Sequence, residues 1–237
     1  HDIRAMLDAA SRGDALTGLS VYLDTIKNTH VEVSYGRKYT DTNVARENVG
    51  LDFSTTPLAK TNLYARVKYD IPSESYNEVL FGAKISPLKD LVLRGEYYQS
   101  YPTFDIASIY SIFAVDQYKE KSIAAEYQIT SNYRVSVKYA REDFGNDANA
   151  NVYQVGLLAR PIKDLTLNAI YEARNGYAGQ LSGIRLYGEY KIAKAAIMAG
   201  IDYDDFRREV SREGTAKKYW AGLNYEFSKM ISAFVRV

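Results

Sequence analysis

The 237-residue sequence has no cysteine, only five prolines and a single tryptophan. Without cysteine it can form no disulfide framework, no cysteine-based zinc site and no haem-attachment motif. Its two histidines, His1 and His30, offer little material for acid–base catalysis. No apolar run approaches the ~20 residues that a membrane-spanning helix needs. These absences exclude several common classes of enzyme, metalloprotein and helical membrane protein.

Neither the net charge nor the mean hydropathy identifies the class of protein on its own. Thirty lysines and arginines against 29 acidic residues leave a formal net charge of +1, which provides no bulk attraction for nucleic acid or anionic lipid. The mean hydropathy of −0.32 suits a soluble protein. It equally suits a membrane β-barrel, because only every second residue of such a barrel faces lipid.

What the sequence does contain is a strong alternation of apolar and polar residues. In 133–141, Tyr133, Val135 and Val137 alternate with Arg134, Ser136 and Lys138. Period-two patterns place the two sets on opposite faces of a sheet. The pattern predicts strands near 16–25, 30–39, 47–55, 61–70, 76–86, 91–100, 118–129, 133–142, 151–160, 165–174, 181–192, 195–205, 216–228 and 231–237.

The segments between these strands alternate in length. Short turns are expected at 26–29, 56–60, 87–90, 130–132, 161–164, 193–194 and 229–230. Longer, more polar loops are expected at 40–46, 71–75, 101–117, 143–150, 175–180 and 206–215. Short turns on one rim and long loops on the other are typical of antiparallel up-and-down barrels in outer membranes.

Architecture therefore gives the chain a resemblance to bacterial outer-membrane porin-type β-barrels. Closing about fourteen strands leaves an interior too wide for apolar side chains to fill, so the apolar face is expected to meet lipid. The fold class we predict is an all-β, transmembrane, antiparallel up-and-down β-barrel of about 14 or more strands. The resemblance covers residues 16–237 and rests on no family-specific motif.

Two sets of residues follow from this interpretation. The charged positions of the alternation are expected to face the lumen: Arg66, Lys68, Lys84, Arg94, Glu96, Glu126, Arg134, Lys138, Arg160, Glu172, Arg185, Glu189, Lys191, Asp202 and Glu226. Tyrosines at strand ends beside the long loops are expected to form an aromatic girdle at the lipid headgroups: Tyr35, Tyr39, Tyr69, Tyr97, Tyr98, Tyr139, Tyr171, Tyr190, Tyr203 and Tyr225. Because both charge signs occur among the lumen candidates, they favour neither anions nor cations.

The ends of the chain depart from the porin pattern. Residues 1–15 are expected to form a helical or loop segment, since Ile3, Met6 and Leu7 fit a helical spacing, and residues 16–237 to form the barrel. The resemblance implies that both termini lie on the short-turn side and that the last strand ends in an aromatic residue. The first and last predicted strands fit neither rule. The chain is therefore interpreted as a segment of a larger barrel, the alternative being one misassigned connection near each end.

No catalytic, cofactor or metal site is predicted. His30 lies beside a short turn with no evident partner, and Asp202, Asp204 and Asp205 are interpreted as an acidic rim rather than a calcium site. The most apolar stretch, 104–115, lies in the longest expected loop. We interpret it as the top of a tall hairpin, with a constriction in the lumen or a docking segment as alternatives.

The leading hypothesis is a pore of the bacterial outer membrane for passive diffusion of small polar solutes. Its expected partners are outer-membrane lipid, those solutes and a protein in the lumen or at the 101–117 loop, but no nucleic acid. One alternative is a barrel that sheathes a partner protein such as a multihaem cytochrome. A second is a soluble binding protein rich in β-hairpins; an enzyme is disfavoured.

Overall fold

The computed structural model describes residues 2–9, 14–24, 27–40, 43–101, 117–145, 148–177, 179–208, 212–228 and 231–236. All regular secondary structure within these ranges is β-strand. The described part contains no helix long and apolar enough to span a membrane.

The strands are long and follow one another closely along the chain. They are β1 (Asp2–Ala9), β2 (Asp14–Leu23), β3 (Thr29–Thr40), β4 (Asn43–Leu58), β5 (Thr61–Asp70), β6 (Ser75–Leu88), β7 (Leu91–Ser100), β8 (Tyr118–Thr130), β9 (Tyr133–Asp143), β10 (Asn149–Ile162), β11 (Leu165–Gly176), β12 (Gln180–Ile192), β13 (Ala195–Arg208), β14 (Arg212–Ser228) and β15 (Ile231–Arg236). Most of them reach or exceed the ~10 residues of a membrane-spanning strand.

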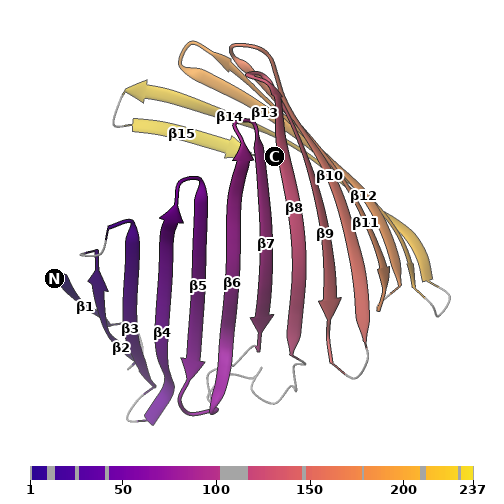
Figure 1. Cartoon of the computed structure of the whole chain (residues 1–237). Coiled ribbons are helices and arrows are strands. Elements are labelled where there is room, and N and C mark those ends of the chain that lie inside the picture. Colours follow the sequence, from indigo (N-terminus) through magenta and orange to yellow (C-terminus); the bar gives the residue numbers. More distant parts are fainter. Residues whose placement is uncertain are drawn as a thin grey trace. The chain divides into compact units, whose positions relative to one another are not determined.

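Every strand is hydrogen-bonded to its neighbour in the sequence. The order runs from β1 to β15 without a crossover in one 15-stranded sheet, and the pairings that are described are antiparallel. Figure 1 shows this succession of hairpins. Within the described residues β1 and β15 each have one strand neighbour. The predicted antiparallel up-and-down topology is therefore confirmed.

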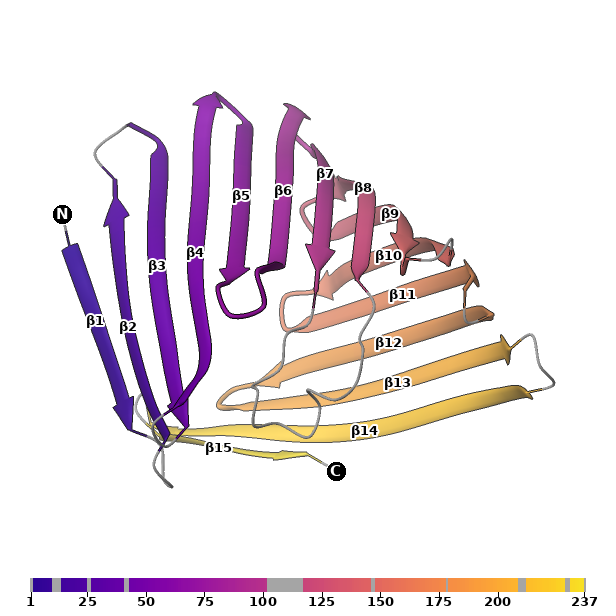
Figure 2. The same cartoon turned by 90° about the horizontal axis from the view of Figure 1, so that it is seen from below.

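The chain divides into two units, which we describe separately. Unit 1 comprises 1–87, 94–122 and 142–147, and unit 2 comprises 88–93, 123–141 and 148–237. In unit 1, β1 to β6 lie side by side, and in unit 2, β10 to β14 do so (Figure 2). In each unit we call the strand ends joined by the expected short turns the turn rim, and the opposite ends the loop rim.

The N-terminal segment differs from the sequence-based expectation. Asp2–Ala9 forms strand β1, paired with β2 from Asp2 opposite Tyr22 to Ala9 opposite Ala15, so a helix there is wrong. The apolar spacing that fits a helix also fits period two in part, because Ile3, Ala5 and Leu7 alternate with polar Asp2 and Arg4. When a short segment fits both periods, tertiary pairing decides its structure. Here the backbone N–H and C=O groups of β1 find their hydrogen-bond partners in β2.

The loop-rim connections are mostly shorter than expected. Only two residues separate β3 from β4, three separate β11 from β12, and three separate β13 from β14. The strands continue into segments predicted as loops, and Arg207 of β13 forms an ion pair with Glu213 of β14 at 2.9 Å. The polar composition of these segments predicts loops, but the segments form the ends of paired strands. The expected long connection at 101–117 remains, and the apolar stretch 104–115 lies outside the described residues.

Two of the prolines in the strands, Pro57 and Pro161, lie where the hydrogen-bond ladder is interrupted. The register shifts between Thr55 and Leu58 of β4, around Pro57, and between Ala159 and Ile162 of β10, around Pro161. Proline has no backbone N–H to donate, so a bulge next to a turn is one of the few strand positions that accepts it. These bulges explain why proline can sit inside β4 and β10.

Few side chains are buried. Among the described residues no large side chain is fully buried, and the buried apolar residues are small: Ala45, Ala140, Ala150, Val152 and Ala159. By contrast Leu167 is 42% exposed and Leu186 is 44% exposed. The described part of the sheet thus has no dry apolar centre between its strands, and many of its large apolar side chains are exposed.

Candidate membrane belt and pore lining

Cross-strand register assigns each residue to one of two faces, because residues directly opposite each other in an antiparallel pair share a face. In β12, Arg185 lies opposite Asp202 of β13, while Leu186 lies opposite Ala169 of β11 and Ile201 of β13. Continuing these pairings separates a charged face from an apolar face in unit 2. The cross-strand register also separates a charged face from an apolar face in unit 1, where Arg66 lies opposite Asp52 and Val67 opposite Leu51.

The lumen candidates all fall on the charged face of their own unit. Register, alternation and contacts place Arg66, Lys68, Lys84, Arg94 and Glu96 there in unit 1. The same information places Glu126, Arg134, Lys138, Arg160, Glu172, Arg185, Glu189, Lys191, Asp202 and Glu226 there in unit 2. That this face lines a lumen stays a prediction.

In unit 1 the charged face carries a continuous set of ion pairs across β4, β5 and β6. The Arg66 Nε lies 2.6 Å from the Asp52 carboxylate, and its Nη1 lies 3.7 Å from Glu78. The Lys68 ammonium lies 2.8 Å from the same Glu78. Because opposite charges face each other across strands, these groups stabilise the register as well as keeping the face polar.

Unit 2 holds a second set of ionic and polar contacts. Glu172 accepts hydrogen bonds from Gln154 at 2.6 Å and from Arg185 at 3.1 Å. Arg134 lies 3.7 Å from Glu126. The arginines and the carboxylates are therefore interleaved, which gives the face mixed charge rather than a field of one sign.

Several residues of the charged face are missing from the sequence-based set. Asp52, Glu78 and Gln154 bind the predicted residues directly but were not singled out. The same alternation that identified Arg66 would have included Asp52 and Glu78, which occupy the corresponding positions of β4 and β6.

The apolar face of unit 2 is ordered in rows across β11 to β14. From the turn rim to the loop rim, the rows are Ile192, Ala195 and Tyr225; Leu165, Tyr190, Ile197 and Leu223; Leu167, Gly188, Ala199 and Ala221; Ala169, Leu186, Ile201 and Tyr219; and Tyr171, Ile184, Tyr203 and Lys217. Beyond them the face becomes polar, first with Ser182, Asp205 and Thr215, then with Gln180, Arg207 and Glu213. Tyrosines therefore mark both edges of an apolar band.

The height of this band can be estimated from the strand geometry. Ile192 and Ile184 are eight residues apart in β12, about 27 Å along a strand at ~3.4 Å per residue. With a strand tilt of about 40° this corresponds to about 21 Å, close to the ~25 Å apolar band of membrane barrels. The band in unit 2 is therefore close in height to the apolar band of membrane barrels.

Unit 1 repeats the arrangement. Rows of apolar residues end in Leu19, Tyr35, Val49 and Tyr69, and the Tyr69 ring packs edge-on against Tyr76 at 5.2 Å. The next row toward the loop rim holds Arg37 and Glu47, whose side chains lie 3.9 Å apart. The Tyr35 hydroxyl donates a hydrogen bond to this Glu47 carboxylate. In both units, tyrosines and an ion pair therefore lie near the loop-rim end of the apolar face.

The girdle candidates occupy three different places. Those on the apolar face toward the loop rim are Tyr35, Tyr39, Tyr69, Tyr97, Tyr139, Tyr171 and Tyr203. Tyr190 and Tyr225 are also on the apolar face but lie at the turn rim, so their expected place beside the long loops is wrong. Tyr98 follows Tyr97 directly and alternation puts it on the charged face, with its ring 6.1 Å from that of Tyr118.

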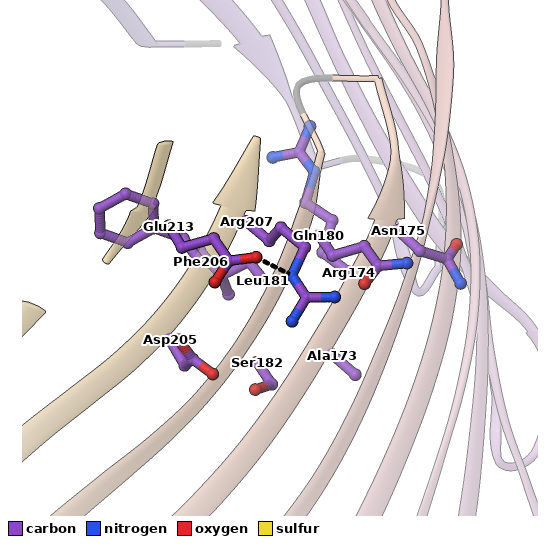
Figure 3. A pocket seen from close by; sticks show the side chains of 10 residues that line it. All are labelled: Ala173, Arg174, Asn175, Gln180, Leu181, Ser182, Asp205, Phe206, Arg207 and Glu213. Atoms are coloured by element: carbon purple, nitrogen blue, oxygen red, sulfur yellow. Dashed lines mark ion pairs between the residues drawn. The ribbon is translucent and has the colours of Figure 1, made fainter. Parts of the chain in front are cut away.

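A polar hollow of about 370 Å³ lies at the loop rim of unit 2 (Figure 3). The Arg207 and Glu213 ion pair lies beside it, with Gln180, Ser182 and Asp205 on the strands around it. All five belong to the polar rows beyond the tyrosine edge. In a membrane this position would be level with lipid headgroups rather than with hydrocarbon.

His30 and the acidic cluster at 202–205 both lie within the described residues. His30 has the partners that the sequence did not reveal: its Nδ1 lies 2.6 Å from Asp24 and its Nε2 lies 3.9 Å from Glu32. Asp204 shares the charged face with Asp202, whereas Asp205 lies on the opposite face, so alternation divides the acidic cluster. Within the described ranges no group of three or more His, Asp or Glu residues is placed to hold a metal ion.

Together these features define an antiparallel up-and-down sheet of the membrane β-barrel class. No protein-family description matches the sequence, and no curated protein matches it. Solved structures do match. An engineered variant of Rhodopseudomonas blastica porin shares 15% identity with a TM-score of 0.58, and the match covers 94% of this chain and 84% of that chain. A structure described as a bacterial polysaccharide outer membrane secretin shares 9% identity with a TM-score of 0.57, covering 94% and 82%.

A third match, from work on the asymmetric conductivity of engineered proteins, has 15% identity and a TM-score of 0.57. At these identities the likeness concerns the fold. The chain therefore has the fold of porin-type β-barrels, as predicted from its alternation.

Proposed function

We propose that this protein is an outer-membrane β-barrel that forms a pore for passive diffusion of small polar solutes. The observation that carries the proposal is the inverted distribution of side chains. The apolar face is exposed, the opposite face holds the ion pairs, and the described part has no large buried side chain.

In water such a surface would be unstable. Exposed residues including Leu167, Leu186 and Ile201 form a broad apolar surface, whereas soluble monomers rarely expose contiguous patches beyond a few hundred Å². Hydrocarbon removes this cost, and the apolar band is close in height to the ~25 Å band of membrane barrels. A membrane barrel therefore accounts for the exposed apolar face better than a soluble binding protein built from β-hairpins does.

The charged face supports a pore that passes polar solutes with weak ion selectivity. Arg66 and Lys68 alternate with Asp52 and Glu78, so the face attracts water and ions of both signs. The porin neighbours and the structure from work on asymmetric conductivity support a channel on the same fold. This combination also supports a location in the bacterial outer membrane.

Planar-bilayer recording tests the proposal. Purified protein refolded in detergent is expected to insert into the bilayer and to produce discrete, reproducible conductance steps in KCl, with a reversal potential near zero in a KCl gradient. Heat-denatured protein in the same detergent serves as the control. Folded, membrane-inserted protein that yields no conductance steps would contradict the pore.

A further inference from the structure

The charged face of unit 2 contains a pair of stacked aromatic rings. The rings of Tyr187 and Trp220 have centroids 5.6 Å apart and planes 27° apart. They belong to one straight row across four strands, in which Asn168, Tyr187, Gly200 and Trp220 lie opposite one another in turn. We call Tyr187 and Trp220 the ring pair; β11 to β14, which carry this row, lie side by side in Figure 2.

Gly200 makes this arrangement sterically feasible. A Cβ atom at Gly200 would lie 2.4 Å from the Trp220 Cε2 and Nε1 atoms, which is far inside van der Waals contact. The absent side chain lets Trp220 lean across β13 toward Tyr187. Glycine weakens a strand interior, so its presence in the middle of β13 fits a requirement for close approach.

Covering glycine with a ring occurs elsewhere on these faces and does not by itself indicate binding. In unit 1, Tyr64 covers Gly82 and donates its hydroxyl to Glu96. The row in unit 2 differs because Trp220 already covers Gly200. The second ring, from Tyr187, is not needed for that purpose, and with it the aromatic pair spans β12 to β14.

Polar groups that can bind hydroxyls surround the ring pair. The Tyr187 hydroxyl donates to the Glu189 carboxylate at 2.6 Å, and the Lys191 ammonium lies 3.4 Å from the same residue. Asp202 and Lys218 lie opposite each other on the row next to it toward the loop rim, and Asn168 continues its own row. Two aromatic rings beside carboxylate, amide and ammonium groups are the combination that recognises a ligand with one apolar face and a polar edge.

We propose that the ring pair is a binding site for neutral saccharides on the lining of the pore. A pyranose ring presents C–H groups on its faces and hydroxyls on its edge, so it can stack on Tyr187 and Trp220 while its hydroxyls bond to the neighbouring polar side chains. The balanced charges nearby favour a neutral ligand. A structural neighbour described as a polysaccharide secretin is consistent with this class. The inference rests on the proposed pore function, since it names one class of solute for it.

The single tryptophan of the chain provides a direct measurement. Maltohexaose and cellohexaose are titrated into the protein folded in detergent, and Trp220 emission is recorded. We expect a saturating change in intensity or wavelength with at least one of the two sugars, with a dissociation constant on the order of millimolar. Sorbitol, which has no pyranose ring, is expected to give no saturating change.

Variants separate binding from glycine covering. Tyr187→Ala keeps the fluorophore and removes one ring, and we expect at least about tenfold weaker binding. Tyr187→Phe keeps the ring and is expected to bind within about threefold of the unchanged protein. Tyr219→Ala is the matched control, because Tyr219 adjoins Trp220 in β14 but lies on the apolar face.

The outcomes are distinct from those for the pore. No saturating change with either sugar, or equal affinity in Tyr187→Ala, overturns the saccharide site. A change with tetramethylammonium alone also overturns it, because the ring pair would then be a cation site. The fluorescence titrations are made on detergent-folded protein and do not record current. A conducting pore without sugar binding therefore refutes only the saccharide site. Sugar binding without conductance refutes the pore alone.

Discussion

Replacing Leu186 with arginine is expected to lower the free energy of unfolding in lipid vesicles by about 2–4 kcal/mol. Leu186 lies in the middle of the apolar band of unit 2, in a row with Ala169, Ile201 and Tyr219. A guanidinium at this depth would lose its hydration without a described partner on the apolar face beside it. Urea titration of vesicle-bound protein, followed by tryptophan emission, measures the change.

Ser182→Arg is the matched control for this result. Ser182 lies on the same strand and the same face, but in the polar row beyond the tyrosine edge, opposite Asp205. The same charge there is expected to cost about 0–1 kcal/mol. Equal losses for the two variants would show that the apolar band does not lie in hydrocarbon.

Reversing the charge of Arg66 and Lys68 together is expected to make the pore cation-selective. The variant Arg66→Glu with Lys68→Glu changes the charge of the lining by four units and leaves Asp52 and Glu78 without these cationic partners. The resulting negative potential should raise the cation-to-anion permeability ratio by at least about threefold. Reversal potentials in a KCl gradient measure the ratio.

A control pair carries the same charge change on the other face. Arg207→Glu with Lys217→Glu alters residues on the apolar face near the loop rim of unit 2, outside the charged face. This pair is expected to change selectivity far less. A permeability ratio that responds equally to both pairs, or to neither, would argue against the charged face as the ion path.

Alternation was sufficient to predict the faces of the sheet. Every lumen candidate from Arg66 to Glu226 lies on the charged face of its unit, because a period of two survives any error of a few residues in strand ends. Strand ends themselves were less predictable. Polar residues such as Arg207 and Glu213 suggested a loop but form a cross-strand ion pair, which only the pairing reveals.

Contacts between individual side chains could not be predicted from the alternation either. The pairing of His30 with Asp24 and the stacking of Tyr187 on Trp220 depend on register and on side-chain direction. Tyr98 illustrates a different error. It was grouped with Tyr97 although neighbouring residues of a strand must face opposite sides, so a stricter use of the alternation would have excluded it.

Cysteine scanning of β12 tests the central claim most directly, since the chain has no cysteine of its own. Six single variants carry cysteine at positions 184 to 189, are refolded into lipid vesicles, and are treated with a charged, membrane-impermeant thiol reagent. Positions 185, 187 and 189 are expected to react at least about tenfold faster than 184, 186 and 188, because the first set faces water and the second faces lipid. Uniform reactivity along the strand, or faster reaction at 184, 186 and 188, would contradict an apolar face in lipid and a charged face in water.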